Sequence, residues 1–250
     1  MDLLKPLTTR LTSHPKLLIS ALSIAAPIAY LSYLHYTLST STSHVRSSGP
    51  LTRESVKDIS SVPAAVLGGG YKMVRDKAWK RVPATQMPGL GGEEMVTLYL
   101  RETMGLFARR FPQAYLLRVV APGGSRTFEK EYIKKCAFEK GDVVAGVYQV
   151  AEKEGGKEGG RVEFEMVMSA EKREGAPEGR LVVGGREVEG GWEWWSETVM
   201  WVEEGGRMPL EGRGVRWLHE VAAWWLLGRG VEFLRGLGRR ESGMEGLLDI

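Results

Sequence analysis

Some residue types and motifs are rare or missing in this sequence, and each shortage argues against a class of protein or limits what the chain can form. The 250 residues contain one cysteine, Cys136, so no intramolecular disulfide can form. They contain no asparagine, so no N-glycosylation site exists that could report on membrane topology. A GxSxG nucleophile elbow, a P-loop and a GxGxxG loop after a strand are also missing. This argues against serine hydrolases and against nucleotide- or dinucleotide-dependent enzymes.

Histidine is scarce where a metal site would need it. His14, His35 and His44 lie near the N-terminus, and only His219 lies in the expected folded part. We therefore expect no metal site and no cofactor there. Cys136 follows two lysines, but no histidine lies near it in the sequence to activate the thiol.

The net charge of +3 comes from the N-terminal part of the chain. The first 60 residues carry six basic and three acidic side chains, which leaves equal numbers of both signs in the remainder. Phosphate binding needs a concentrated cationic face, so we do not expect nucleic acid as a partner.

Leu17–Leu38 is an apolar run without a single Asp, Glu, Lys or Arg. A helix of that length reaches roughly 33 Å, enough to cross a hydrocarbon core of about 30 Å. The run therefore predicts a transmembrane helix and membrane lipid as a partner, with Tyr30, Tyr33 and Tyr36 at an interface. A cleaved signal peptide is the alternative, although its apolar region is usually shorter, about 7–15 residues.

The basic residues around this run indicate its orientation. Lys5, Arg10 and Lys16 precede it closely, whereas the basic residues that follow lie farther away. This slight bias favours a cytoplasmic N-terminus in a single-pass endomembrane protein, and the side is left open.

Composition divides the chain into five segments. Residues 39–61 are rich in Ser and Thr and have no helical or strand period, which predicts a flexible stalk. The segments are a basic N-terminus at 1–16, a transmembrane helix at 17–38, the stalk at 39–61, a single α+β domain at 62–237 and a tail at 238–250.

Hydrophobic periodicity predicts helices at both ends of the domain and strands between them. Helical spacing predicts helices at Glu93–Phe111 and Val215–Leu237. A period of two, with Gly-rich turns, predicts strands at 115–121, 143–151, 161–168 and 192–202, after a possible first strand at 71–80. In the third of these strands we expect Phe164 and Met166 on the dry face, and Glu163 and Glu165 on the wet one.

An antiparallel sheet with one apolar face must be covered, and the C-terminal helix is the large element left to do so. We therefore predict an α+β fold in which a curved antiparallel sheet packs on a long C-terminal helix. This arrangement resembles the START-like (SRPBCC, helix-grip) superfamily. The resemblance implies a hydrophobic cavity between the sheet and the last helix.

Six sequence blocks also resemble an uncharacterised family of fungal single-pass membrane proteins. The resemblance implies the fold and a eukaryotic membrane setting, and it implies no chemistry. The blocks are FPQAYLLRVV at 111–120, SRTFEKEYI at 125–133, GDVVAGVYQV at 141–150, RVEFEMVM at 161–168, SETVMW at 196–201 and RWLHEVAAWWLL at 216–227.

Tryptophans are concentrated near the C-terminal end of the predicted sheet. Alternation places Trp192 and Trp194 on one face of their strand and Trp195 and Trp201 on the other. Indole rings offer large apolar areas, so they suit a pocket for a hydrophobic small molecule, and they equally suit an ordinary core. The candidate ligand-binding residues are Trp192, Trp194, Trp195, Trp201, Trp217, Phe164 and Met166.

Two ionisable residues are candidate catalytic groups. Glu197 lies among these tryptophans, where desolvation would prepare a general acid. His219 lies near the start of the last helix, from which an imidazole could reach a cavity as a base. A wet-face glutamate and a solvated or core histidine are the alternatives.

Three functions remain open. The first is a membrane-tethered domain that binds a lipid or a polyketide- or terpenoid-like molecule in a sheet–helix cavity. The second is a cofactor-independent cyclase or isomerase, in which Glu197 and His219 act as acid and base. The third is a membrane-anchored protein-interaction module without a cavity. An enclosed apolar cavity would support the first two, and a filled core would support the third.

Overall fold

The computed structural model describes residues 15–120, 124–167 and 175–248, with the side chains of 15–22, 24, 120 and 241–248 left aside. The predicted basic N-terminus at 1–16 lies almost wholly outside the described residues. The chain forms two compact units, Met1–Ser41 and Thr42–Ile250.

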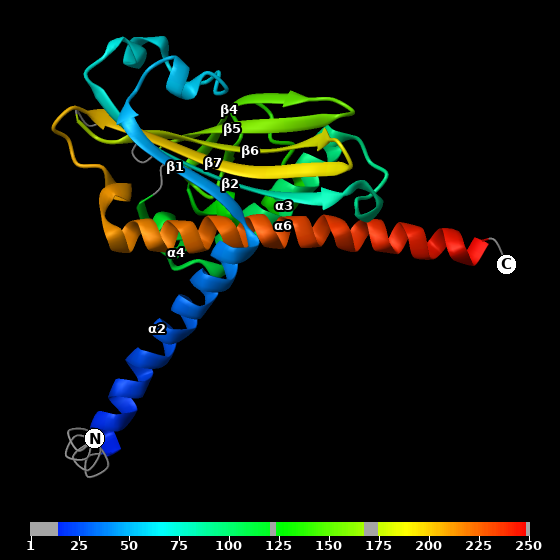
Figure 1. Cartoon of the computed structure of the whole chain (residues 1–250), viewed down its shortest axis with the longest axis horizontal. Coiled ribbons are helices and arrows are strands. Elements are labelled where there is room, and N and C mark those ends of the chain that lie inside the picture. The colour runs from blue at the N-terminus through cyan, green and yellow to red at the C-terminus, as the bar shows by residue number, and fades with distance from the viewer. Residues whose placement is uncertain (1–14, 121–123, 168–174, 249–250) are drawn as a thin grey trace. The chain divides into compact units, whose positions relative to one another are not determined.

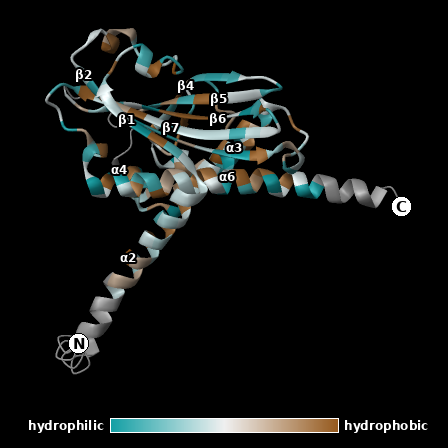
Figure 2. Cartoon of the chain, viewed as in Figure 1, coloured by the Kyte–Doolittle hydropathy of each residue, from teal (hydrophilic) through white to brown (hydrophobic). Residues whose placement is uncertain are grey.

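The first unit contains helix α2 (Pro15–Ser41), which includes the whole apolar run (Figure 1). The transmembrane prediction for 17–38 is not confirmed, because none of the described residues forms a helix with the length and apolarity needed to cross a membrane. The described part of α2 mixes Tyr, Ser, Thr and His with its apolar residues, which lowers its hydropathy (Figure 2). Pro27 stands inside the helix.

The second unit is built on a seven-stranded antiparallel sheet, which confirms the predicted α+β class. Its strand order is β1-β2-β7-β6-β5-β4-β3 (Figure 1). The strands are β1 (Ser43–Pro50), β2 (Tyr71–Pro83), β3 (Val143–Val144), β4 (Tyr148–Gly155), β5 (Gly159–Met166), β6 (Glu178–Val188) and β7 (Gly191–Glu203). The long strands β2 and β7 pair along their whole length, from Tyr71 with Glu203 to Pro83 with Gly191.

Helices α3 (Gly92–Arg110) and α6 (Arg213–Leu248) pack on the same face of the sheet and on each other. α3 begins with Glu93 and Glu94 and ends with Arg109 and Arg110, so charges of suitable sign lie at both ends of its dipole. Gly230 of α6 lies so close to α3 that an added Cβ would fall 2.2 Å from the Tyr99 ring. This helix packing confirms the predicted role of the C-terminal helix.

The turn between β4 and β5 is fixed by the start of α3. The backbone N–H groups of Gly92 and Glu93 donate to the carbonyl oxygens of Lys157 and Gly156. The first N–H groups of a helix have no partner inside the helix, so the turn satisfies two of them. This Gly-rich hairpin turn, residues 156–158, thus has a structural role.

One end of the opposite face of the sheet is covered by residues 51–70, which we call the strap (Figure 1). The strap contains two 3-10 turns, η1 (Glu54–Val56) and η2 (Ala64–Gly68). Its buried apolar residues pack against Met73, Val199 and Trp201 of the sheet. They are Leu51, Val56, Ile59, Val62 and Val66.

The structure corrects three of the sequence predictions. The predicted stalk at 39–61 consists instead of the end of α2, strand β1 and the first half of the strap. The predicted strand at 115–121 is instead helix α4 (Pro112–Val120), which begins with proline at a favourable helical position. The predicted tail at 238–250 continues α6 as far as Leu248.

Two short helical elements pack beside α3. They are α5 (Lys130–Lys135) and the 3-10 turn η4 (Ser125–Phe128). Both lie between α4 and strand β3 in the sequence, and both contact α3.

Candidate functional site

The tryptophans of β7 divide between the two faces of the sheet, as the alternation predicts. Trp192 and Trp194 face the helices, where the Trp194 ring stacks on Tyr99 of α3 with 5.1 Å between centroids. Trp195 and Trp201 face the other way. Trp201 is fully buried under the strap, and Trp195 is partly exposed.

The other predicted ligand-binding residues differ in how deeply they are buried. Phe164 is fully buried and meets the rings of Phe138 and Tyr148 edge-on. Met166, at the end of β5, and Trp217, in the second turn of α6, are only partly buried. The structure therefore does not bring the whole predicted set together.

The layer between the sheet and α6 is filled with side chains. Trp194, Leu227 and Leu234 are all 0% exposed in this layer. Two hollows stand out in the part of the chain that the structure describes, one along the β4–β5 turn and one beside Cys136. Both open to solvent and neither lies between the sheet and α6, so neither is the predicted cavity.

Glu197 is buried on the strap face, where two basic residues surround it. Its Oε1 accepts a hydrogen bond from Arg75 Nε at 2.6 Å, and its Oε2 lies 3.3 Å from Lys77 Nζ. Arg75 also donates to the carbonyl oxygen of Ser55 in the strap. Because His219 is on the helix face, the structure does not bring Glu197 and His219 together.

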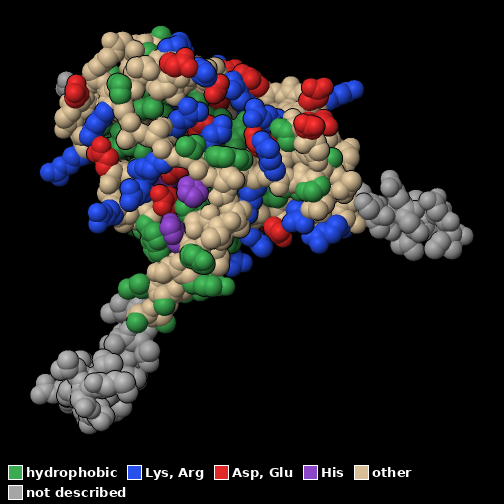
Figure 3. Space-filling model, viewed as in Figure 1, with side chains coloured by type: hydrophobic (Ala, Val, Ile, Leu, Met, Phe, Trp, Pro, Cys, Tyr) green, Lys and Arg blue, Asp and Glu red, His purple; other side chains and the backbone are tan. Residues whose placement is uncertain are grey.

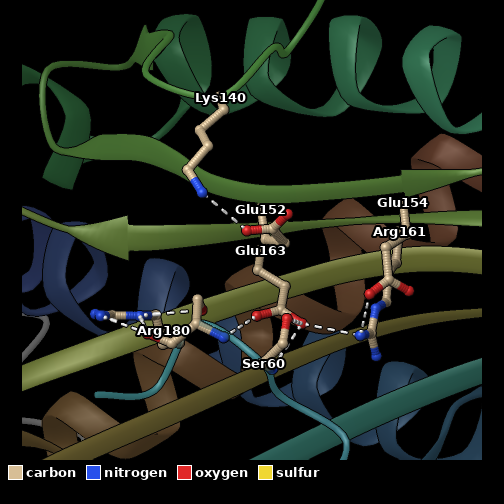
Figure 4. Close-up of polar contacts among 8 residues, drawn as sticks. Ser60, Lys140, Glu152, Glu154, Arg161, Glu163 and Arg180 are labelled. Carbon is tan, nitrogen blue, oxygen red and sulfur yellow. Dashed lines mark hydrogen bonds and ion pairs between the residues drawn. The ribbon is translucent and has the colours of Figure 1, made fainter. Parts of the chain in front are cut away.

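Glu163 forms a second buried ionic contact on the strap face, where it was expected to be wet (Figure 4). It is 0% exposed. Its carboxylate accepts from Ser60 N–H and Oγ at 3.2 Å and from Ser61 N–H at 2.8 Å, and Arg161 lies 3.4 Å away. The prediction of a wet face was wrong for Glu163 because the strap covers it.

Arg180 of β6 adds a buried cation to the same region. It donates to the carbonyl oxygen of Ser61 from Nε and Nη2, at 3.1 and 2.9 Å, and its guanidinium lies over the Trp201 ring. Burial lowers the pKa of Arg180 below its ordinary value, although neighbouring glutamates raise it. We refer to Glu163, Arg180, Ser60, Ser61 and Arg161 as the strap network.

A group of ionisable residues lies on the helix face, where α6 crosses β1 and β2. Asp76 of β2 is 6% exposed, and its Oδ2 has no hydrogen-bond partner among the described residues. Arg46 of β1 lies 3.8 Å from Asp76 and 3.9 Å from Glu220 of α6. His219 interacts electrostatically with Asp76. We call Arg46, Asp76, His219 and Glu220 the α6 polar cluster.

Burial shifts the acid and the base of this cluster in opposite directions. It raises the pKa of Asp76 above the ordinary carboxyl value, although His219 and Arg46 lower it. It lowers the pKa of His219 below the ordinary imidazole value, although the charges of Asp76 and Glu220 raise it. Buried ionisable groups with shifted pKa values occur at functional sites and also in structural ion-pair networks.

Of this cluster, the sequence analysis identified only His219. Asp76 could have been found, because alternation along 71–80 places it in line with apolar Val74 and Ala78. Arg46 was missed because its segment was assigned to a stalk. His44 was misplaced for the same reason: it lies in β1, and its ring is 4.5 Å from Trp224 of α6.

The surroundings of Cys136 do not activate its thiol. Burial raises the pKa of the Cys136 thiol to about 11, so the thiolate form is disfavoured. Within the described residues, no group of His, Cys, Asp and Glu is arranged to hold a metal ion.

No family model, curated protein or solved structure matches the chain. The likeness to the START-like superfamily and to fungal single-pass proteins therefore stays a prediction.

Proposed function

We propose that the chain is a membrane-associated interaction module, in which α2 binds the membrane and the unit from Thr42 to Ile250 recognises its partner with its outer surface. One observation carries the proposal. The apolar side chains between the sheet and α6, where a ligand cavity would lie, are buried against one another. The large apolar side chains of α2 are exposed.

The exposed residues of α2 support membrane association. Ile28, Tyr30, Tyr33 and Tyr36 are each more than half exposed, at 58, 63, 66 and 67%. Aromatic and aliphatic residues of this kind favour the interface of a bilayer.

The hydroxyl groups of α2 are also compatible with apolar surroundings. Thr37, Ser39, Thr40 and Ser41 donate to backbone carbonyl oxygens three or four positions earlier. Because these hydroxyl groups are satisfied inside the helix, the bilayer does not have to supply a partner.

Vesicle flotation tests the membrane part of this proposal. The full chain should float with phosphatidylcholine vesicles, and Ile28→Asp should weaken flotation. Val45→Asp is the matched control, because Val45 is 52% exposed on β1. A full chain that stays in the aqueous fraction would refute membrane association.

A second candidate function is the helix-grip carrier or isomerase. The order of the sheet and its terminal helix supports it, and so does the α6 polar cluster, which places an acid and a base at the sheet–helix boundary. Ligand entry would require α6 to move away from the filled layer.

Native mass spectrometry of the purified full chain separates the two candidates. An interaction module should show the mass of the chain alone. A stoichiometric apolar small molecule that copurifies, and that dissociates from a Trp194→Ala variant, would favour the carrier.

A further inference from the structure

We propose that helix α4 is a docking surface for an anionic bilayer. This inference rests on the proposed membrane association and names the partner of one surface of the folded unit.

The outward face of α4 is apolar. Tyr115, Leu116 and Val119 are 54, 72 and 85% exposed, whereas Ala114 on the inner face is 0% exposed. A helix on the surface of a soluble domain usually presents polar residues outward. On α4 Tyr115, Leu116 and Val119 lie outward instead, so this surface suits contact with something other than water.

Exposed apolar residues are otherwise few on this unit. Apart from α4, the large apolar side chains that the structure describes as exposed on it are Val45 of β1, and Val215 and Leu218 in the first turns of α6. Phe111, just before α4, contacts Trp225 of α6 edge-on at 5.6 Å, so the two helices are neighbours. Figure 3 shows hydrophobic and basic side chains side by side over the first turns of α6.

The charge around α4 indicates which partner it fits. Residues 109–126 contain four arginines and no acidic residue. Arg109 and Arg110, at the end of α3, are exposed. Arg118 donates to the carbonyl oxygen of Ala108 at 3.1 Å and lies over the Tyr115 ring, so it holds the helix in place.

An apolar helix face flanked by arginines complements an anionic lipid surface. The apolar residues can enter the boundary between headgroups and acyl chains, while the arginines meet lipid phosphates and carboxylates. A protein partner of equal fit would need a matching acidic rim around an apolar groove. The bilayer is favoured because the proposed membrane association of α2 would keep the same chain at a bilayer.

An environment-sensitive fluorophore on α4 tests the docking directly. The full chain carries Cys136→Ser and Val119→Cys, labelled with NBD, and the control carries Cys136→Ser and Val45→Cys. Each is mixed with vesicles of phosphatidylcholine alone or of equal parts phosphatidylcholine and phosphatidylserine. We expect a blue shift and brighter emission at position 119 with the mixed vesicles, and no change at position 45.

Unlabelled variants that keep Cys136 give an independent measurement. Arg109→Gln and Arg110→Gln should each weaken binding to the mixed vesicles by about fivefold and leave binding to phosphatidylcholine unchanged. Leu116→Asp with Val119→Asp should weaken binding to the mixed vesicles by about tenfold or more.

The outcomes separate this inference from the proposed function. If the chain floats with vesicles while the probe at 119 remains in water and the α4 variants bind like the native chain, α4 docking is refuted and membrane association stands. If the chain floats with neither kind of vesicle, both are refuted. If the α4 variants float normally and lose a protein partner instead, the surface is a protein interface and the bilayer assignment is wrong.

Discussion

Replacing Glu163 with glutamine tests whether the strap network holds the strap on the sheet. Glutamine keeps the size of the side chain but puts an NH₂ group where one carboxylate oxygen now accepts from Ser60 or Ser61. A hydrogen bond to a charged group contributes about 1.5–3 kcal/mol, and a buried donor left unpaired costs about 1–3 kcal/mol. We therefore expect the free energy of unfolding to fall by roughly 3 kcal/mol.

Thermal unfolding and hydrogen exchange measure this effect. For a unit of this size, each kcal/mol lowers Tm by about 2–4 °C, so the expected decrease is roughly 6–12 °C. At least one of the Ser60 and Ser61 amides should exchange faster in the variant, because glutamine keeps one acceptor oxygen and loses the other.

Glu154→Gln is the matched control for this experiment. Glu154 also pairs with Arg161, at 2.7 Å, but its side chain is 56% exposed (Figure 4). Exposed ion pairs contribute about 0–1 kcal/mol. Equal losses in the two variants, or unchanged exchange at Ser60 and Ser61 in Glu163→Gln, would show that the strap network does not hold the strap.

Three further predictions concern the helix face and the thiol. Trp194→Ala should lower the free energy of unfolding by about 3–5 kcal/mol in urea titration, and a smaller loss than for the partly exposed Trp195→Ala would contradict a filled layer. Burial lowers the pKa of His219 from 6.5, so the unfolded chain binds more protons as pH falls through 6.5 and stability decreases. In urea titrations above and below pH 6.5, the free energy of unfolding should fall less at the lower pH in His219→Asn than in the native chain. An equal fall in both proteins would show that His219 does not cause this pH dependence. Because its pKa is raised to about 11, Cys136 should react slowly with iodoacetamide at neutral pH and rapidly only after unfolding, as followed by mass spectrometry.

The sequence was sufficient for those parts of the fold that have a clear hydrophobic period. The helix predicted at 93–111 and the strand predicted at 192–202 agree with α3 and β7 to within about two residues. The division of the β7 tryptophans between two faces followed from alternation alone. Each of these elements buries one face, so the spacing of its apolar residues indicates whether it is a helix or a strand.

The strap and α4 could not be predicted in the same way. The strap buries five apolar residues spaced three to five positions apart, but Ser, Gly and Pro among them allow only short 3-10 turns, so its composition was typical of a linker. Glu163 then looked like a wet residue, because only the strap removes it from water. In α4, β-favouring Tyr and Val suggested a strand, whereas the segment forms a helix that begins with Pro112 and turns Ala114 inward.

The position of β1 has a practical consequence for anyone who shortens this chain. β1 forms the outer edge of the sheet and covers β2 from Pro50 opposite Lys72 to Ser43 opposite Trp79. Truncation at residue 51 or 62 would strip this cover and leave a long row of unpaired N–H and C=O groups along β2, a template for edge-to-edge aggregation. A soluble fragment should therefore start no later than Thr42, and one that starts at residue 62 should precipitate or form sheet-swapped oligomers.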